Sequence, residues 1–377
     1  MKIDFNRPFA TGKEFEYIRS AITTAHLSGH GQFTQKCQVW LEQQMQSRKA
    51  LLTHSCTAAL EMAAILADIK PGDEVIMPSF TFVSTANAFV LRGGIPVFAD
   101  IRPDTLNLDE TKIEAAITPK TRAIAPVHYA GVGCDMDAIM EIARRHSLLV
   151  IEDAAQCIMS NYKGRPLGGI GHLGALSFHE TKNIISGEGG ALLVNDERFI
   201  QRAEIIWEKG TNRSQFFRGQ VDKYTWVDIG SSFLPSEILA AFLWAQMEDV
   251  ASITKRRVAI WNRYHAKFAD AEKQGLFRRP VIPADCTNNA HMYYLLTRDH
   301  AMQMRTLQGL KARGIQAVFH YIPLHSAPAG RKYGRVHGSM QVTDKTSETL
   351  VRLPMWVGLE DQDVDVIADL IIETSVQ

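Results

Sequence analysis

The sequence contains no long hydrophobic run, and its most apolar helical stretch, Thr85 to Val90, is far too short to span a bilayer. The first residues lack the apolar core of a signal peptide. There are only five cysteines and no CxxC pair, so we expect no disulfide framework and no metal site. The formal net charge is zero, which gives no global attraction for nucleic acid. These absences predict a cytoplasmic protein that binds neither membrane nor nucleic acid.

The composition is that of an ordinary globular protein, with 46% hydrophobic and 22% charged residues. A chain of 377 residues is too long for one small core. We expect a large α/β domain over residues 1–249, including the N-terminal segment, and a smaller α+β domain over residues 250–377.

Short apolar segments alternate with helical patterns along the first domain. Seven of them are predicted strands, at 49–53, 74–78, 96–100, 122–128, 148–153, 175–179 and 191–195. Helices are predicted at about 57–67, 81–92, 135–146 and 236–268. Apolar strands without clean alternation, separated by helices, are typical of a mostly parallel sheet that is covered on both faces. The predicted architecture is therefore an open α/β layer structure.

Polar side chains follow the carboxyl ends of these strands, where open α/β sheets bind their ligands. Ser55, Cys56 and Thr57 open a helix whose backbone N–H groups could bind a phosphate. Asp153 ends one strand, and Lys182 lies in a polar turn after another. Such a lysine could lose its proton and attack a carbonyl, while the aspartate could hold a protonated ring nitrogen. Together they suggest a site for pyridoxal phosphate (PLP), a cofactor that acts as an electron sink.

Each of these residues also has an ordinary structural interpretation. Asp153, Ser55 and Thr57 could cap helices. Lys182 could be a solvated surface lysine, and Phe82 could belong to the core. Spacing alone leaves both interpretations open, although the common placement at strand ends favours one shared site.

Five longer motifs carry a resemblance to a known family. They are His54-Ser-Cys-Thr-Ala-Ala-Leu60, Pro78-Ser-Phe-Thr-Phe-Val-Ser-Thr-Ala-Asn87, Val127-His-Tyr-Ala-Gly131, Glu152-Asp-Ala-Ala-Gln156 and Ser177-Phe-His-Glu-Thr-Lys-Asn183. Over essentially its whole length the chain resembles the nucleotide-sugar aminotransferases of the DegT/DnrJ/EryC1/StrS family. The resemblance implies PLP fold type I, an aspartate aminotransferase-like α/β fold with a mostly parallel seven-stranded sheet.

The same resemblance implies a role for each residue of a cofactor site. Lys182 would be the Schiff-base lysine, and Asp153 would pair with the pyridinium nitrogen of PLP. Gln156 would lie near the ring hydroxyl, and Phe82 would stack on the ring. The residues around the phosphate would be Ser55, Cys56, Thr57, Ser177 and, from the partner subunit, Ser232.

The chain departs from the family pattern at two of these positions. Many members have glycine where this chain has Cys56, and a side chain is tolerated there only if φ stays negative. Many members have an asparagine that reaches the phosphate of the neighbouring subunit, where this chain has Ser232. Serine can still donate one hydrogen bond. This cross-subunit role implies a homodimer with shared active sites.

The nucleotide diphosphate of a substrate needs cations, which a chain of zero net charge must supply locally. The long polar loop over 208–228 offers Lys209, Arg213, Arg218 and Lys223, although such a loop could simply be solvated. His320, Tyr321 and His325 in the second domain could line the sugar side of the cleft, or be ordinary buried side chains.

By resemblance, we expect an aminotransferase that moves the amino group of L-glutamate to C4 of a dTDP-linked 4-keto-6-deoxy sugar. A PLP-dependent sugar dehydratase of the same fold is an alternative, but in such relatives a histidine replaces Lys182. A non-catalytic regulator is another, but Lys182, Asp153 and the phosphate loop are all retained. The nucleotide base and the configuration at C4, galacto or gluco, stay open.

Overall fold

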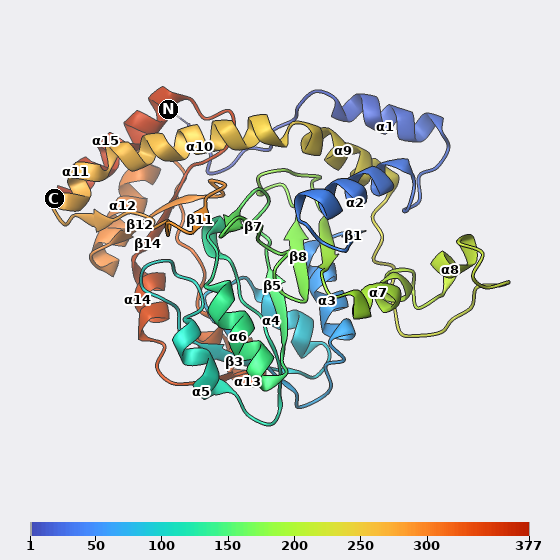
Figure 1. Ribbon diagram of the computed structural model, residues 1–377. Helices are drawn as coiled ribbons and strands as arrows, with labels where there is room; N and C mark the ends of the chain where they lie inside the picture. Colours follow the sequence, from blue (N-terminus) through green and yellow to red (C-terminus); the bar gives the residue numbers. More distant parts are fainter. Residues whose placement is uncertain (1, 377) are drawn as a thin grey trace.

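An eight-stranded sheet forms the centre of the computed structural model, which describes residues 2–376 (Figure 1). The strand order is β1-β9-β8-β5-β4-β2-β3-β13. Neighbours from β8 to β13 run parallel, whereas β9 is antiparallel to both β1 and β8. The strands are β1 Lys49–Thr53, β2 Glu74–Pro78, β3 Ile95–Ala99, β4 Thr121–Ile124, β5 Leu149–Asp153, β8 Leu173–Ser177, β9 Gly190–Val194 and β13 Arg335–Val336. The predicted α/β class with a mostly parallel sheet is confirmed.

All seven predicted strands form, and the sheet gains an eighth from the second domain. β1 and β2 have the predicted bounds, and β8 begins two residues earlier than predicted. β13 is only two residues long and pairs with β3. An ion pair holds it in place, because Nε of Arg335 lies 2.8 Å from Oε1 of the buried Glu74. A strand this short depends on tertiary contacts and has no pattern of its own.

Helices cover both faces of the sheet because alternate strand residues point to opposite sides. Val150 faces one hydrophobic core and Ile151 faces the other. On the Ile151 side lie α3 Cys56–Leu66, α4 Val83–Val90 and α7 Ile200–Trp207. On the Val150 side lie α2 Gln32–Gln44, α5 Ile113–Ala116, α6 Met136–His146 and α9 Glu237–Glu248. α1 Glu14–Thr23 packs against α9.

The helix predicted over 236–268 is two helices, α9 and α10 Val250–Lys267. The chain leaves helical geometry at Asp249, where φ is −107° and ψ is 9°. Apolar residues continue on both sides of this residue, so periodicity alone does not reveal a break of one residue. α10 then opens the second domain and runs along the edge of the molecule (Figure 1).

The second domain is built around a small antiparallel sheet of β10 Phe277–Arg278, β12 Tyr293–Thr297 and β14 Leu350–Leu353. Its helices are α10, α11 Ala269–Lys273, α12 His300–Ala312, α13 Pro328–Tyr333, α14 Gln341–Thr349 and α15 Asp361–Val376. A third sheet joins β11 Cys286–Thr287 to β6 Asn161–Tyr162 and β7 Arg165–Pro166. The boundary at 249/250 stays a prediction, since Ile3 bridges to Ile315 and β13 returns to the large sheet.

The polar loop over 208–228 holds one short helix, α8 Arg213–Phe217, and lies at the edge of the molecule away from the central strands (Figure 1). Within residues 2–376, no helix is both long and apolar enough to cross a membrane.

Candidate active site

Asp153 lies at the carboxyl end of β5, on the face of the sheet that carries α3 and α4. The hydroxyl of Thr85 in α4 donates to Oδ2 of Asp153 over 2.6 Å, and the Ala155 N–H donates to Oδ1 over 3.2 Å. A second hydroxyl, of Thr81, lies 2.8 Å from that of Thr85. The carboxylate is therefore buried and oriented, and each oxygen keeps a lone pair for a further donor.

Lys182 lies in a closed turn that follows β8, the strand next to β5 in the sheet. Its N–H donates to the carbonyl of His179 over 2.9 Å. The side chain of the next residue, Asn183, donates to the carbonyl of Asn289 over 2.8 Å and lies 2.9 Å from Nδ1 of His291. Burial lowers the pKa of Lys182, while the charges of Cys56 and Asp153 act to raise it. A lysine whose pKa is lowered by burial gives up its proton more readily, which suits it to attack a carbonyl.

The N-terminus of α3 is the predicted phosphate-binding turn. Ser55 is the N-cap, and its hydroxyl accepts from the Ala58 N–H over 3.1 Å. The N–H groups of Cys56 and Thr57 lie in the first turn, where a helix offers them no acceptor, so they are available to an anion. Cys56 has a negative φ, which meets the condition set by its side chain. Burial raises the pKa of its thiol well above the usual value.

Gly190 of β9 brings Ser177 to this same turn. It pairs with Thr53 on one side and with Ser177 on the other. A Cβ atom at residue 190 would lie only 2.4 Å from the backbone N of Cys56, so the close packing requires glycine. The ends of β8, β9 and β1 thus place Ser177 beside the N-terminus of α3.

Gln156 and Phe82 border the Asp153 side of the site. Oε1 of Gln156 accepts from the Ala130 N–H over 2.6 Å. Burial raises the pKa of Tyr321, and a side-chain hydrogen bond with Gln156 acts to lower it. Phe82 precedes α4 and is 58% exposed, so it is not a core residue. Its ring lies 6.5 Å from that of Tyr321, which connects it to the second domain.

His320 and Tyr321 belong to an aromatic cluster between the two domains. Their rings lie 3.5 Å apart, and the hydroxyl of Tyr129 lies 2.5 Å from Nδ1 of His320. Burial lowers the pKa of His320 well below its usual value, so its imidazole is neutral. His325 lies apart from these rings, with Nδ1 2.8 Å from the hydroxyl of Ser79 and Nε2 3.2 Å from Asp344.

The predicted diphosphate cations lie in the projecting loop, where two of the four already have carboxylate partners. Arg213 pairs with Glu208 at 3.4 Å, and Arg218 pairs with Glu204 at 2.8 Å. The other two cations, Lys209 and Lys223, are exposed. The exposed Ser232 bridges to Glu208, which places it beside Lys209.

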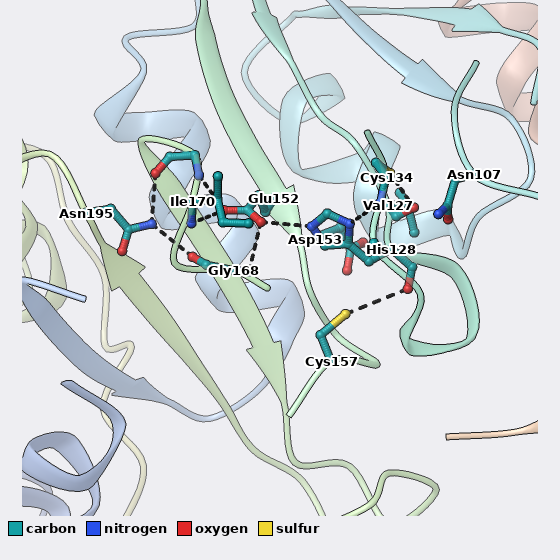
Figure 2. Close-up of polar contacts among 12 residues, drawn as sticks. Asn107, Val127, His128, Cys134, Glu152, Asp153, Cys157, Gly168, Ile170 and Asn195 are labelled. Atoms are coloured by element: carbon teal, nitrogen blue, oxygen red, sulfur yellow. Dashed lines mark hydrogen bonds and ion pairs between the residues drawn. The ribbon is translucent and has the colours of Figure 1, made fainter. Parts of the chain in front are cut away.

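Glu152, the neighbour of Asp153 on β5, points to the opposite face of the sheet and is fully buried (Figure 2). Nε2 of His128 lies 2.8 Å from its Oε2. Nδ1 of His128 accepts from the Cys134 N–H over 3.1 Å, so the imidazole is neutral with its proton on Nε2. Three backbone N–H groups also donate to the carboxylate, those of Gly168, Ile170 and Gly171. This network fixes the end of β5 and with it the backbone of Asp153.

Replacing Glu152 by glutamine is expected to destabilise the protein by about 2–4 kcal/mol. The amide NH2 of glutamine would face backbone N–H donors that now donate to a carboxylate oxygen. Urea denaturation of the variant measures this change in the free energy of unfolding. Glu141→Gln is the control, since Glu141 is exposed and pairs with neighbouring arginines, and we expect no measurable change in stability. An equally small effect at Glu152 would contradict the network.

Sequence reasoning missed Thr85, Glu152, Asn183 and His291 as parts of this site. Glu152 and Asp153 form an acidic pair at the end of a buried strand, which is a usable signal because neighbouring strand residues face opposite sides. Thr85, Asn183 and His291 are recognised only once the fold brings their elements together.

Comparison with known proteins extends over nearly the whole chain. The model of the DegT/DnrJ/EryC1/StrS aminotransferase family matches residues 9–372. GDP-perosamine synthase of Caulobacter vibrioides is 32% identical over 371 residues, which are 97% of this chain and 96% of that protein. The spore coat polysaccharide biosynthesis protein SpsC of Bacillus subtilis is also 32% identical, over 96% of this chain and 94% of its own length.

A solved structure shares the fold described above. It is a protein from Streptococcus pneumoniae assigned as a sugar aminotransferase, in its PLP form, with a TM-score of 0.91 and 25% identity. The match covers 100% of this chain and 99% of that one. The fold is thus that of the PLP-dependent sugar aminotransferases, and PLP is the cofactor. Because the family model covers residues 9–372, the chain belongs to the DegT/DnrJ/EryC1/StrS aminotransferase family.

Proposed function

We propose that this protein transfers the amino group of L-glutamate to C4 of dTDP-4-keto-6-deoxy-D-glucose and releases dTDP-4-amino-4,6-dideoxy-D-galactose. The observation that carries the proposal is the placement of Lys182 beside Asp153 and the N-terminus of α3, in a chain of this aminotransferase family. Every part that amino transfer needs from the protein is then present: an amine, a carboxylate and an anion site.

The residues have distinct parts in the proposed reaction. Bound PLP would supply the electron sink. Lys182 would hold the cofactor covalently and, once displaced by the donor's amine, would take the proton from the donor's α-carbon. Asp153, kept in position by Thr85, would hold a proton at the ring nitrogen. The N–H groups of Cys56 and Thr57 would bind the phosphate.

Three longer sequence motifs support the identity proposed for the sugar and for the nucleotide base of the substrate. They are Phe216-Phe-Arg-Gly-Gln-Val-Asp-Lys-Tyr-Thr-Trp226, Gly230-Ser-Ser-Phe233 and Val318-Phe-His-Tyr-Ile-Pro-Leu-His325. They resemble dTDP-4-amino-4,6-dideoxygalactose transaminase, an enzyme of enterobacterial common antigen synthesis. We infer that the product serves such an antigen or an O-antigen. The gluco epimer is the alternative product, and the likeness to GDP-perosamine synthase favours a GDP-linked keto sugar as the alternative substrate.

Incubation with L-glutamate and dTDP-4-keto-6-deoxyglucose tests this function. Proton NMR couplings at C4 of the product distinguish an axial amine, as in the galacto sugar, from an equatorial one, as in the gluco sugar. We expect the galacto pattern. An equatorial amine would mean that the product is the gluco epimer. Turnover only with a GDP-linked sugar would mean that the proposed substrate is wrong. If L-glutamate leaves the absorption spectrum of the bound cofactor unchanged, the transaminase proposal itself is overturned.

We further propose a homodimer whose two sites are shared, and place the protein in the cytoplasm. The projecting loop supports the dimer, since Phe217 and Trp226 are 67% and 79% exposed and two large apolar side chains this exposed suggest an interface. Gly230 and Ser232 connect this loop to the phosphate site, because the neighbouring Phe233 carbonyl accepts from the His54 N–H over 3.1 Å. That bond lies within one chain, so a direct test of the shared site is needed.

Mixing two inactive variants provides this test. Lys182→Ala chains combined with Ser232→Glu chains are expected to regain activity, because one site of each heterodimer then takes Lys182 from one chain and Ser232 from the other. The second site carries both defects, so about half of the parental activity per heterodimer is the upper limit. A charged replacement is used because the loss of one serine hydrogen bond costs only about 1 kcal/mol.

Native mass spectrometry of the mixture confirms that subunits have exchanged. If exchange is complete and no activity returns, the loop over 230–233 acts within its own chain, and the shared-site model is wrong.

A further inference from the structure

His291 lies just before β12 and is buried beside the turn of Lys182. The residue is 5% exposed, and its Nδ1 lies 2.9 Å from Oδ1 of Asn183, the residue after the lysine. The amide nitrogen of Asn183 donates to the backbone carbonyl of Asn289 over 2.8 Å, which fixes the orientation of the amide. An amide oxygen can only accept, so the proton of His291 is on Nδ1 and points to Asn183.

The imidazole of His291 is neutral. Burial lowers its pKa well below the usual value, and the charges of Lys182, Arg257 and Arg352 lower it further. Within residues 2–376 its Nε2 makes no hydrogen bond, so the polar contact of this side chain with them is the one to Asn183. Losing that contact would leave a buried N–H without an acceptor, which is unfavourable, so the imidazole holds Asn183 firmly.

The loop that carries His291 is itself fixed to the second domain. Arg257 of α10 is buried and donates to the carbonyl of Ala290 over 3.1 Å and to that of His291 over 2.7 Å. The N–H of Ala290 donates to the side chain of Asn288 over 2.7 Å. Ala290 has a φ of 55°, a left-handed conformation that a non-glycine residue keeps where its surroundings enforce it. The loop is therefore a rigid support for the imidazole.

Asn289 connects the same loop to the segment that follows Asp153. It is fully buried, and its side-chain nitrogen donates to the carbonyls of Gln156 and Ile158, over 2.7 and 2.8 Å. One loop of the second domain thus contacts both proposed catalytic segments. It holds the segment after β5 through Asn289 and the turn after β8 through His291.

We propose that His291 is a positioning residue for Lys182 that acts through Asn183, an inference that rests on the proposed transaminase function. Its Nδ1–H holds Asn183 against the rigid loop, and the neighbouring Lys182 is thereby kept on a fixed backbone. The neutral imidazole adds no charge beside the amine. That amine must hold the cofactor and then carry a proton at the same place, so a small displacement of its backbone slows the reaction.

Two replacements separate the two nitrogens of His291. Asparagine has an amide nitrogen at about the place of Nδ1 and can keep the bond to Asn183, whereas glutamine reaches the place of Nε2 and loses it. In the holoenzyme we expect kcat to fall about 10- to 100-fold in His291→Gln with little change in KM, and to stay parental in His291→Asn. His265→Gln is the control and should keep parental turnover. His265 is a half-buried histidine of the second domain, with Nδ1 3.3 Å from the Tyr293 hydroxyl.

A measurement on Lys182 itself detects a displaced turn without relying on catalysis. In the full-length chain with PLP removed, mass spectrometry follows the acetylation of Lys182 against pH, and the midpoint is the pH at which the amine loses its proton. Burial lowers the pKa of Lys182, and the charge of Arg352 acts in the same direction. The charges of Cys56, Asp153 and Cys157 act to raise it.

A loosened turn admits water to the amine and relieves the effect of burial. The midpoint should therefore lie at higher pH in His291→Gln than in the parent, and at the parental pH in His291→Asn and His265→Gln. Circular dichroism verifies that each chain is folded. A parental midpoint in His291→Gln would overturn the proposal whatever its turnover, as would a loss in His291→Asn as large as that in His291→Gln.

Asn183→Ala removes the other end of the same contact, and it replaces His291→Gln if that variant does not fold. It is expected to lower kcat and to raise the midpoint at least as much. In the Asn183→Ala background, His291→Gln should cost less than about twofold more, because the contact through which His291 acts is already gone. A full second loss in the double variant would show that His291 does not act through Asn183.

The proposal and the proposed function fail in different ways. If the enzyme aminates no keto sugar but the midpoint of Lys182 still depends on His291, the function is wrong and the positioning role stands. If amination occurs and His291→Gln changes neither turnover nor the midpoint, the function stands and the positioning role is wrong.

Discussion

Replacing Lys182 by alanine is expected to reduce turnover by at least about 1,000-fold and to remove the covalent bond to PLP. The lysine is proposed both to hold the cofactor and to move the proton, and positioned proton transfer alone contributes about 100- to 10,000-fold. Turnover is followed by release of 2-oxoglutarate, and the covalent bond by borohydride reduction and mass spectrometry. The phosphate site is untouched, so the variant should still bind PLP noncovalently.

Lys163→Ala is the control for this experiment, because Lys163 is a surface lysine paired with Asp137. It should keep parental turnover and parental labelling. If borohydride fixes PLP to the Lys182 variant as fully as to the parent, another lysine is the anchor, and the assignment of the site is wrong.

Replacing Asp153 by asparagine is expected to lower turnover roughly 100- to 1,000-fold while PLP stays bound to Lys182. An amide cannot stabilise a protonated ring nitrogen as a carboxylate does, and losses of this size are typical when one electrostatic contact is removed from an active site. Both chemical half-reactions should slow, which rapid-mixing absorption measurements can follow separately.

Thr85→Val provides a graded comparison, since it removes only the hydroxyl that donates to Oδ2 of Asp153. The expected loss is about fivefold, corresponding to about 1 kcal/mol for one hydrogen bond. Near-parental turnover in Asp153→Asn would leave Asp153 with only a structural role, as the acceptor for the Thr85 hydroxyl and the Ala155 N–H.

The fold was largely predictable because its signals are local. Pro71, Gly72 and Asp73 end one unit and begin the next, so β2 was placed at its observed bounds. Two features have no local signal in the sequence and were therefore not predictable. The break at Asp249 interrupts the helix without interrupting its apolar pattern. β13 exists because Arg335 reaches Glu74, more than two hundred residues away in the chain.

The candidate site was predictable only in part, since its residues are seen in the sequence but their contacts are not. Lys182 and Asp153 stand out as polar residues at strand ends, and the longer motifs supply their proposed roles. The hydroxyl that orients Asp153 comes from α4, and the network that fixes β5 comes from the loop over 168–171.

The central claim is that the amino group passes from glutamate to C4 of the dTDP-linked sugar through chemistry at Lys182. It is tested most directly with L-glutamate labelled with heavy nitrogen and dTDP-4-keto-6-deoxyglucose, followed by NMR of the sugar product. The account predicts that the labelled nitrogen becomes bonded to C4 with the parent enzyme and not with Lys182→Ala. Labelled nitrogen that stays in glutamate with the parent enzyme, or equal transfer by the alanine variant, would contradict it.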